Sequence, residues 1–159
     1  MEWDPEGYRN LRGKTTTLIA YGEKEWDLAG FEQVLATGTV DVVGIDPGRA
    51  EGITGFKKAT ERIEAYRRQS NAHAWSSAIC SAASLAISFS TPSAKLFELK
   101  PLRNPMQHDL VTEPFTHVDG YMLPPTKPGL GIDIIEEVVD RYRSEKVLAD
   151  PAAVGAKFW

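Results

Sequence analysis

The segment "VVGIDPGRAEGIT", from Val42 to Thr54, gives the clearest indication of the fold. Its apolar start is typical of a short buried strand, and the Pro-Gly pair that follows is a strong turn signal. After the turn, "TGFKKATERIEAYRRQ" has apolar residues at helical spacing. Asp46 stands where the apolar run ends and the turn begins. The segment therefore predicts a strand that carries a carboxylate at its tip and is followed by a helix.

The same order of strand, turn and helix recurs along the first hundred residues. The predicted strands are residues 15–23, 40–46, 70–75 and 94–100, and the predicted helices are residues 26–38, 54–69 and 77–89. Alternating strands and helices with short connections imply parallel strands joined by right-handed crossovers. The sequence therefore predicts an α/β fold with a parallel sheet.

Each predicted strand ends on or near an ionisable side chain. In chain order these are Glu23, Asp46, His73 and Glu98. Reactive groups of parallel α/β folds lie at the carboxyl ends of the strands, so we expect the four side chains to share one pocket. Carboxylate oxygens suit a hard cation such as Mg²⁺, and an Asp beside a His suits a base whose tautomer the carboxylate fixes. Zinc is the weaker option, because His73 has no partner at metal-ligand spacing.

After Lys100 the chain is rich in proline and turn signals and reads as an appended layer. We divide the sequence into a part with the four strand tips, residues 1–100, and a carboxyl-terminal extension, residues 101–159. The extension contains His108 and His117, a predicted hairpin around Asp119 and Gly120, and a predicted helix over residues 134–143. The last twelve residues show no periodicity, and we expect them to be poorly ordered.

Composition narrows the class of protein. The chain has 159 residues, 42% hydrophobic and 25% charged, which is typical of a globular domain. A net charge of −4 gives no reason to expect a nucleic-acid partner. The arginines at 62, 67 and 68 alternate with Glu61 and Glu64, so we interpret them as a solvated helix face.

Other sequence features point to the location of the protein and to the state of its one cysteine. No apolar stretch approaches the ~20 residues that span a bilayer, and the first residues do not resemble a signal peptide. We therefore expect a cytoplasmic protein without a membrane partner. Cys80 lies among apolar residues and is predicted to be a small core residue.

Several segments together resemble a known family. They are "PEGYRNLR", "IAYGEKEW", "GIDPGRAEGITGFKKA", "AHAWSSAI", "LFELK", "TEPF" and "DGYMLPPTKPGLGI". In this order the chain from Pro5 to Arg143 resembles the carboxyl-terminal half of an enolase-superfamily enzyme of the mandelate racemase and muconate lactonizing type, especially its acid-sugar dehydratases. The resemblance implies the second half of a (β/α)₈ barrel, with strands five to eight, and a carboxyl-terminal segment that packs on a capping domain.

The resemblance also implies a role for each strand tip. Glu23 matches a carboxylate that binds Mg²⁺. Asp46 and His73 match a dyad in which the histidine moves a proton at the carbon next to a substrate carboxylate, and Glu98 matches an acid that hydrogen-bonds that carboxylate. The implied substrate is a small carboxylate, an acid sugar. Loss of a β-hydroxyl then makes the enzyme a dehydratase, and return of the proton makes it a racemase or epimerase.

The chain departs from the family pattern in extent. Its four strand-helix units leave the family's second-strand base and its third- and fourth-strand metal ligands without a counterpart, and we assign no ligand role to Glu2. We expect another chain or a second copy to complete the barrel. The alternative is a truncated, inactive remnant that forms a homo-oligomer of half-barrels. Smaller departures are Ala72, where proline is frequent in the family, and "AEG" at residues 50–52, where a glycine pair is frequent.

Overall fold

The computed structural model describes residues 4–143, and the expected disorder of the last twelve residues and the position of Glu2 lie outside this range. Four strands form one parallel sheet in the order β1-β2-β3-β4. Their bounds are Ala20–Tyr21 for β1, Val42–Ile45 for β2, Gln69–Ala72 for β3 and Ala94–Phe97 for β4. The α/β class and the parallel sheet are thus confirmed.

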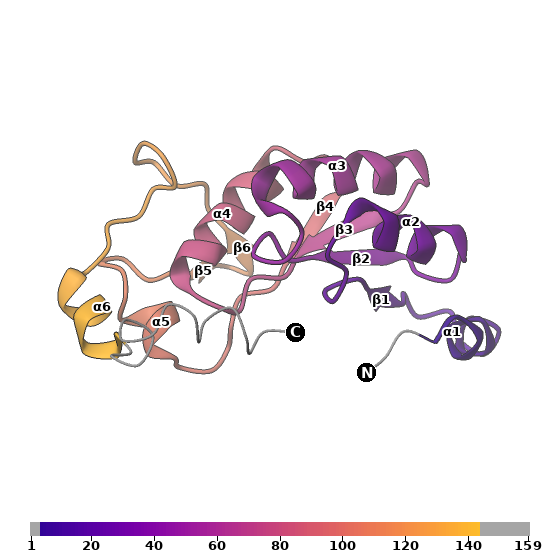
Figure 1. The fold of residues 1–159 in the computed structure, drawn as a ribbon, viewed down its shortest axis with the longest axis horizontal. Helices are drawn as coiled ribbons and strands as arrows, with labels where there is room; N and C mark the ends of the chain where they lie inside the picture. Colours follow the sequence, from indigo (N-terminus) through magenta and orange to yellow (C-terminus); the bar gives the residue numbers. More distant parts are fainter. Residues whose placement is uncertain (1–3, 144–159) are drawn as a thin grey trace, which may run out of the picture.

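Helices cover one face of this sheet (Figure 1). They are α2 (Leu28–Ala36), α3 (Gly52–Ala65) and α4 (Ala78–Phe89), which pack together above the strands, whereas α1 (Pro5–Arg12) lies beside the edge strand β1 and apart from this layer. The hydrophobic core lies in this layer and consists of Phe31, Val34, Leu35, Val40, Val43, Ile45, Ala50, Phe56, Ala59, Ile63, Ala72 and Ile87. Burial of these side chains is the main force that holds the helices on the sheet.

The strand β1 is much shorter than the predicted 15–23. It pairs only at Ala20 and Tyr21, opposite Val42 and Val43. One residue earlier the backbone N–H of Ile19 donates to the carboxylate of Asp41 instead of to a strand. The Ile19 carbonyl still accepts from the backbone of Asp41 and Val42, so a side-chain acceptor replaces the regular strand pairing only at the Ile19 N–H. Strand propensity alone does not reveal this.

The inner face of the sheet contrasts with its helix-covered face. Successive side chains of a strand point to opposite faces, so residues between core members, such as Gly44 and Asn71, lie on the inner face. Leu96 lies there too and is 58% exposed, while its neighbour Phe97 packs against the core. In the described part of the chain β1 pairs only with β2, and β4 only with β3. Both edges of the sheet are therefore open.

The carboxyl-terminal segment packs beside α4. It contains α5 (Pro105–His108), the antiparallel strands β5 (His117–Val118) and β6 (Tyr121–Met122), and α6 (Glu136–Tyr142). The hairpin around Asp119 and Gly120 is confirmed, and both residues have positive φ, 51° and 82°. Gln107 is fully buried and hydrogen-bonds Ser81 of α4, which fixes α5 in place.

An ion-pair cluster lies at the amino-terminal ends of the strands. Asp41 accepts from Arg12 at 3.0 Å and from Arg68 at 3.3 Å. The interpretation of Arg68 as part of a solvated helix face is therefore wrong, because the chain turns after α3 and brings this guanidinium back to Asp41. Arg62 does lie on the helix surface, where it pairs with Glu32.

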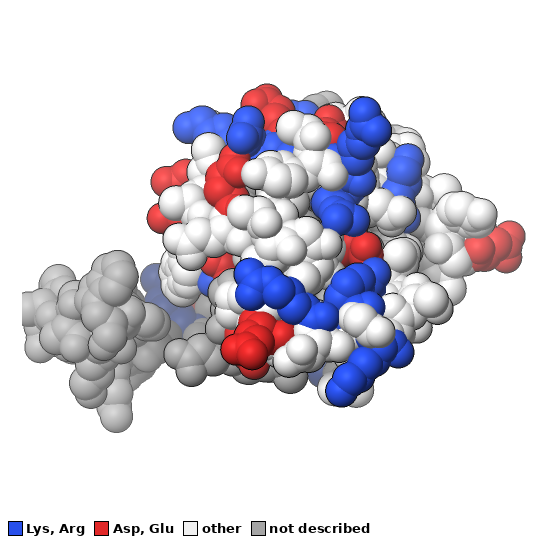
Figure 2. Space-filling view, turned by 90° about the vertical axis from the view of Figure 1, so that its right-hand side faces the viewer, with Lys and Arg blue, Asp and Glu red and all other residues white. Residues whose placement is uncertain are grey.

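The side of the molecule on which α1 lies in Figure 1 has no single dominant charge. Figure 2 shows basic and acidic side chains interspersed among uncharged ones on this face. Among the described residues no helix combines the length and apolarity needed to cross a bilayer.

Candidate active site

Asp46 lies directly after β2, and the turn that follows holds its carboxylate in place. Its Oδ1 accepts from the backbone N–H of Gly48 at 2.7 Å, and its carbonyl accepts from Arg49 and Ala50. The side chain is almost fully buried, at 4% exposure of the residue. The Pro-Gly turn after the apolar strand thus delivers a buried, oriented carboxylate at the strand tip.

His73 lies one residue beyond β3 and is brought to the same place by the parallel register. Its backbone N–H donates to Ile45 at 2.9 Å, which continues the β2–β3 ladder. Its Nδ1 lies 3.0 Å from Oδ2 of Asp46, and its Nε2 lies 3.2 Å from Oε2 of Glu23. The imidazole therefore lies between two carboxylates that come from two other strand tips.

These contacts shift two pKa values in opposite directions. The hydrogen bond that His73 donates to Asp46 raises the pKa of His73, burial opposes this, and the charges of Glu23 and Glu98 add to the increase. Burial acts to raise the pKa of Asp46, but hydrogen bonds from His73 and Gly48 outweigh it, and the pKa is lowered. Each partner therefore favours the charged form of the other.

Glu98 reaches the same group because the β3–β4 pairing shifts by one residue. Ser70 pairs with Ala94, but Asn71 pairs with Leu96. If the first register had continued, Glu98 would stand opposite Ala74 and point toward the helices. With the shift, its carboxylate lies on the inner face, where it accepts a hydrogen bond from the side-chain amide of Asn71.

Sequence reasoning missed three neighbours of the dyad. Trp75 stacks on His73, with ring centroids 5.7 Å apart, and Arg49 donates to the backbone carbonyl of Glu23 at 2.8 Å. The Sγ of Cys80 lies 3.5 Å from Oδ1 of Asp46, so this cysteine is a neighbour of the site rather than only a small core residue. Burial raises the pKa of the Cys80 thiol.

Asn71 was missed as well, although a signal was present. It precedes His73 by two residues in a predicted strand, and residues two apart share a face. The structure brings all four predicted tip residues to one end of the sheet. Asn71 joins them through its contact with Glu98.

The residues present do not by themselves form a magnesium site. Among residues 4–143 there is no cluster of three or more His, Cys, Asp or Glu side chains that could hold a metal ion. Glu23, the predicted ligand, faces Nε2 of His73 instead. The zinc alternative also finds no support, because His108 and His117 hydrogen-bond their own backbone segments away from the tips.

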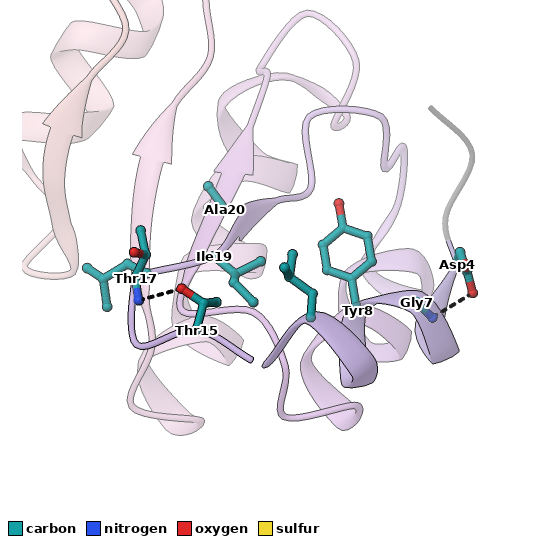
Figure 3. Close-up of a pocket in the computed structure, with 9 residues that line it drawn as sticks. Asp4, Gly7, Tyr8, Thr15, Thr17, Ile19 and Ala20 are labelled. Carbon is teal, nitrogen blue, oxygen red and sulfur yellow. Dashed lines mark hydrogen bonds between the residues drawn. The ribbon is translucent and has the colours of Figure 1, made fainter. Parts of the chain in front are cut away.

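Two hollows bear on what this chain can bind. One, of about 510 Å³, opens at the strand tips and is lined by Glu23, Asp46, Gly48, Arg49, His73, Trp75 and Ser76. A larger groove, of about 690 Å³, lies between α1 and the edge strand β1, far from the dyad in the chain. Figure 3 shows Tyr8 and Gly7 on its helix side and Ile19 and Ala20 on its strand side.

Comparison with known proteins places this geometry in a family. The family model described as "Enolase C-terminal domain-like" matches residues 1–138. The D-gluconate dehydratase of Thermoproteus tenax is 30% identical over 145 residues, which are 89% of this chain and 29% of that protein. The D-galactonate dehydratase of Pectobacterium atrosepticum is 31% identical over 140 residues, 84% of this chain and 37% of that protein.

A solved structure gives the same result. A member of the enolase superfamily from Polaromonas sp. JS666 has a TM-score of 0.79 and 30% sequence identity, over 89% of this chain and 38% of that one. The chain thus spans about a third of the length of the relatives that it matches.

Proposed function

Because the chain belongs to the enolase C-terminal domain-like family, we propose that it supplies the proton-transferring half of an acid-sugar dehydratase. The chain is similar to part of two sugar-acid dehydratases of this superfamily, a D-gluconate and a D-galactonate dehydratase. The proposed role in proton transfer is supported above all by one observation: the His73 imidazole is held at Nδ1 by the buried Asp46.

In this proposal His73 is the general base. Asp46 keeps the proton on Nδ1, so that Nε2 is the nitrogen that takes the proton from the carbon next to the substrate carboxylate. Glu98 contacts that carboxylate. Elimination of the β-hydroxyl as water then gives the dehydrated product, whereas return of the proton gives the racemase alternative, which the dyad serves equally well.

Glu23 cannot keep its present contact when the base acts. It occupies Nε2 of His73, the position that the proton must enter. We therefore propose that completing the barrel draws Glu23 away, toward carboxylates from other strands with which it would hold Mg²⁺. This chain's described residues do not form such a site on their own.

The proposed partner is a polypeptide that carries the missing strand-helix units. Open parallel edges present unpaired backbone groups, and the groove between α1 and β1 lies beside one of them. A second copy of this chain is the other candidate, because the same two open edges could pair in a homo-oligomer of half-barrels.

Reconstitution tests the proposal. The chain is produced together with the part of the D-galactonate dehydratase relative that it does not match, and D-galactonate is incubated with the complex, Mg²⁺ and D₂O. We expect a dehydrated product with deuterium at the carbon that lost the hydroxyl, because the enol left by elimination takes up a solvent deuteron there as it becomes the ketone. Deuterium at the carbon next to the carboxylate would instead indicate return of the proton, the racemase alternative. A stable complex without deuterium uptake would refute the proposed function, and light scattering of the isolated chain distinguishes a homo-oligomer from a monomer that awaits its partner.

A further inference from the structure

Asn71 is a buried polar residue on the inner face of the sheet, near the carboxyl end of β3. It is 4% exposed, lies on β3 two residues before His73, and donates through Nδ2 to Glu98. Its Oδ1 is buried and has no hydrogen-bond partner among the residues that the structure describes. Asn71 also lines a small hollow of about 250 Å³, whose other lining residues include Glu23, Gly44 and Glu98.

The neighbouring strand is shaped to admit this amide. Gly44 stands opposite Asn71 in the β2–β3 register. A Cβ added to Gly44 would lie 3.3 Å from Oδ1 of Asn71, closer than most such contacts. The absence of a side chain at Gly44 therefore lets the amide lie flat against β2 and point its Nδ2 toward β4.

Fold stability does not explain this residue. A buried carbonyl without a partner is unfavourable, and an apolar side chain of the same size would avoid that penalty. What only the amide provides is a donor for Glu98. The one-residue shift in the β3–β4 pairing acts in the same direction, because it turns Glu98 onto the face where Asn71 lies.

We propose that Asn71 is a positioning residue that holds the Glu98 carboxylate in the pocket beside His73 and thereby tunes binding of the substrate carboxylate. The effect on substrate binding rests on the proposed function of Glu98. The positioning of Glu98 by Asn71 concerns only this chain and is testable without a partner. Asn71 acts through Glu98 and does not touch the reacting atoms.

The contact itself is tested by NMR on the isolated chain. The side-chain amide signals of Asn71 are assigned by their loss in Asn71→Leu, and their shifts are compared between the wild type and Glu98→Gln. We expect both amide protons to move, because their carboxylate acceptor becomes a neutral amide. The matched control is Glu113→Gln, an exposed carboxylate that pairs with Lys127. Unchanged Asn71 signals in Glu98→Gln would overturn the proposal.

The consequence for binding is tested in the reconstituted complex. Asn71→Leu and Asn71→Asp keep the volume but remove the donor, and Gly44→Ala crowds the amide without removing it. We expect KM for the acid sugar to rise about 10-fold or more, the value of one hydrogen bond to a charged group, with a smaller change in kcat. The unfolding midpoint of Asn71→Leu should be unchanged or higher.

These outcomes distinguish failure of the positioning role of Asn71 from failure of the proposed function. An unchanged KM in all three variants, or a parallel loss of kcat and stability, would show that Asn71 is only structural. If the wild-type complex shows no deuterium uptake at all, the proposed function fails, while the NMR result still decides whether Asn71 positions Glu98.

Discussion

The two ends of the parallel sheet both gather charged side chains, but they do so in different ways. At the amino-terminal ends Asp41 lies between two arginines and also accepts from the backbone of Ile19. At the carboxyl ends His73 lies between Asp46 and Glu23. One end has an excess of permanent cations around a carboxylate, and the other an excess of carboxylates around one titratable imidazole.

This difference separates stability from chemistry. Arg12, Asp41 and Arg68 come from segments that precede, join and follow the first two strand-helix units, so their contacts lock these segments together. The group around His73 contains an imidazole whose pKa is raised by Asp46, with burial acting against this, and a titratable group of this kind is not needed in a purely structural cluster. In barrels of parallel strands the carboxyl-terminal face is generally the reactive one.

The largest expected effect is on catalysis at the carboxyl-terminal end. In the reconstituted complex, His73→Asn should lower the rate of α-proton removal, followed as deuterium uptake from solvent, by about 10²- to 10⁴-fold, because the base is removed. Uptake is measured by mass spectrometry in D₂O. Arg68→Gln, at the other end, should leave the rate per folded molecule unchanged. Equal losses of rate in the two variants would contradict the claim that only the carboxyl-terminal end of the sheet takes part in catalysis.

Stability should respond in the opposite way. Asp41→Ala leaves the Ile19 amide without its acceptor and removes the carboxylate that two guanidinium groups share, although each of these keeps a backbone carbonyl acceptor. We expect it to lower the free energy of unfolding by about 1.5–3 kcal/mol. Asp133→Ala is the control, because it removes an exposed partner of Lys127 and should cost less than about 1 kcal/mol. Urea unfolding measures both. Similar losses would show that the cluster at Asp41 is no more than a surface contact.

The two ends should also differ in pH dependence. The raised pKa of His73 stabilises the fold fully below its ordinary value of 6.5, and this contribution disappears as pH rises through the folded-state value. The free energy of unfolding should therefore fall above pH 6.5, by at most about 1.4 kcal/mol per pH unit. The dependence should vanish in His73→Asn.

The acid limb has a different origin. The lowered pKa of Asp46 contributes stability above its ordinary value of 3.8, which is lost as pH falls through the folded-state value. Asp46→Asn should remove this limb. A pH profile that neither variant alters would mean that the dyad does not form in solution.

The smallest effect concerns the turn after Asp46. Glu51 has φ 56° and ψ 32°, a left-handed conformation that glycine adopts without strain. Glu51→Gly should therefore raise the free energy of unfolding by about 0.5–1 kcal/mol, the difference between relieved strain and added chain entropy. The same change at Glu61, inside α3 and exposed, should lower it by about 1 kcal/mol. Thermal unfolding of the two variants tests the opposite signs.

Much of this arrangement could be predicted from sequence because it follows from local periodicity. The apolar run before Asp46 and the turn after it predict a strand tip, and the same pattern predicts tips near Glu23, His73 and Glu98. The sequence also singled out residues 50–52, where the family often has a glycine pair. In the structure Glu51 has a left-handed backbone conformation there, which glycine adopts more easily.

What sequence reasoning missed depends on contacts between distant segments. The return of Arg68 to Asp41, the shortness of β1 and the neighbourhood of Cys80 and Asp46 each join residues more than twenty positions apart. The one-residue shift between β3 and β4 is likewise a property of two strands together. The contact between Glu23 and His73 involves the residue predicted to bind metal, so its role in the completed barrel stays a prediction.

The central claim is that Asp46 fixes the His73 tautomer, and ¹⁵N NMR of the histidine side chains tests it most directly. As pH is raised through the His73 transition, we predict that Nδ1 keeps its proton and Nε2 loses it. Asp46→Asn should shift the Nδ1 resonance, whereas Asp133→Asn should not. Loss of the proton from Nδ1 first, or an Nδ1 resonance indifferent to Asp46→Asn, would contradict the account.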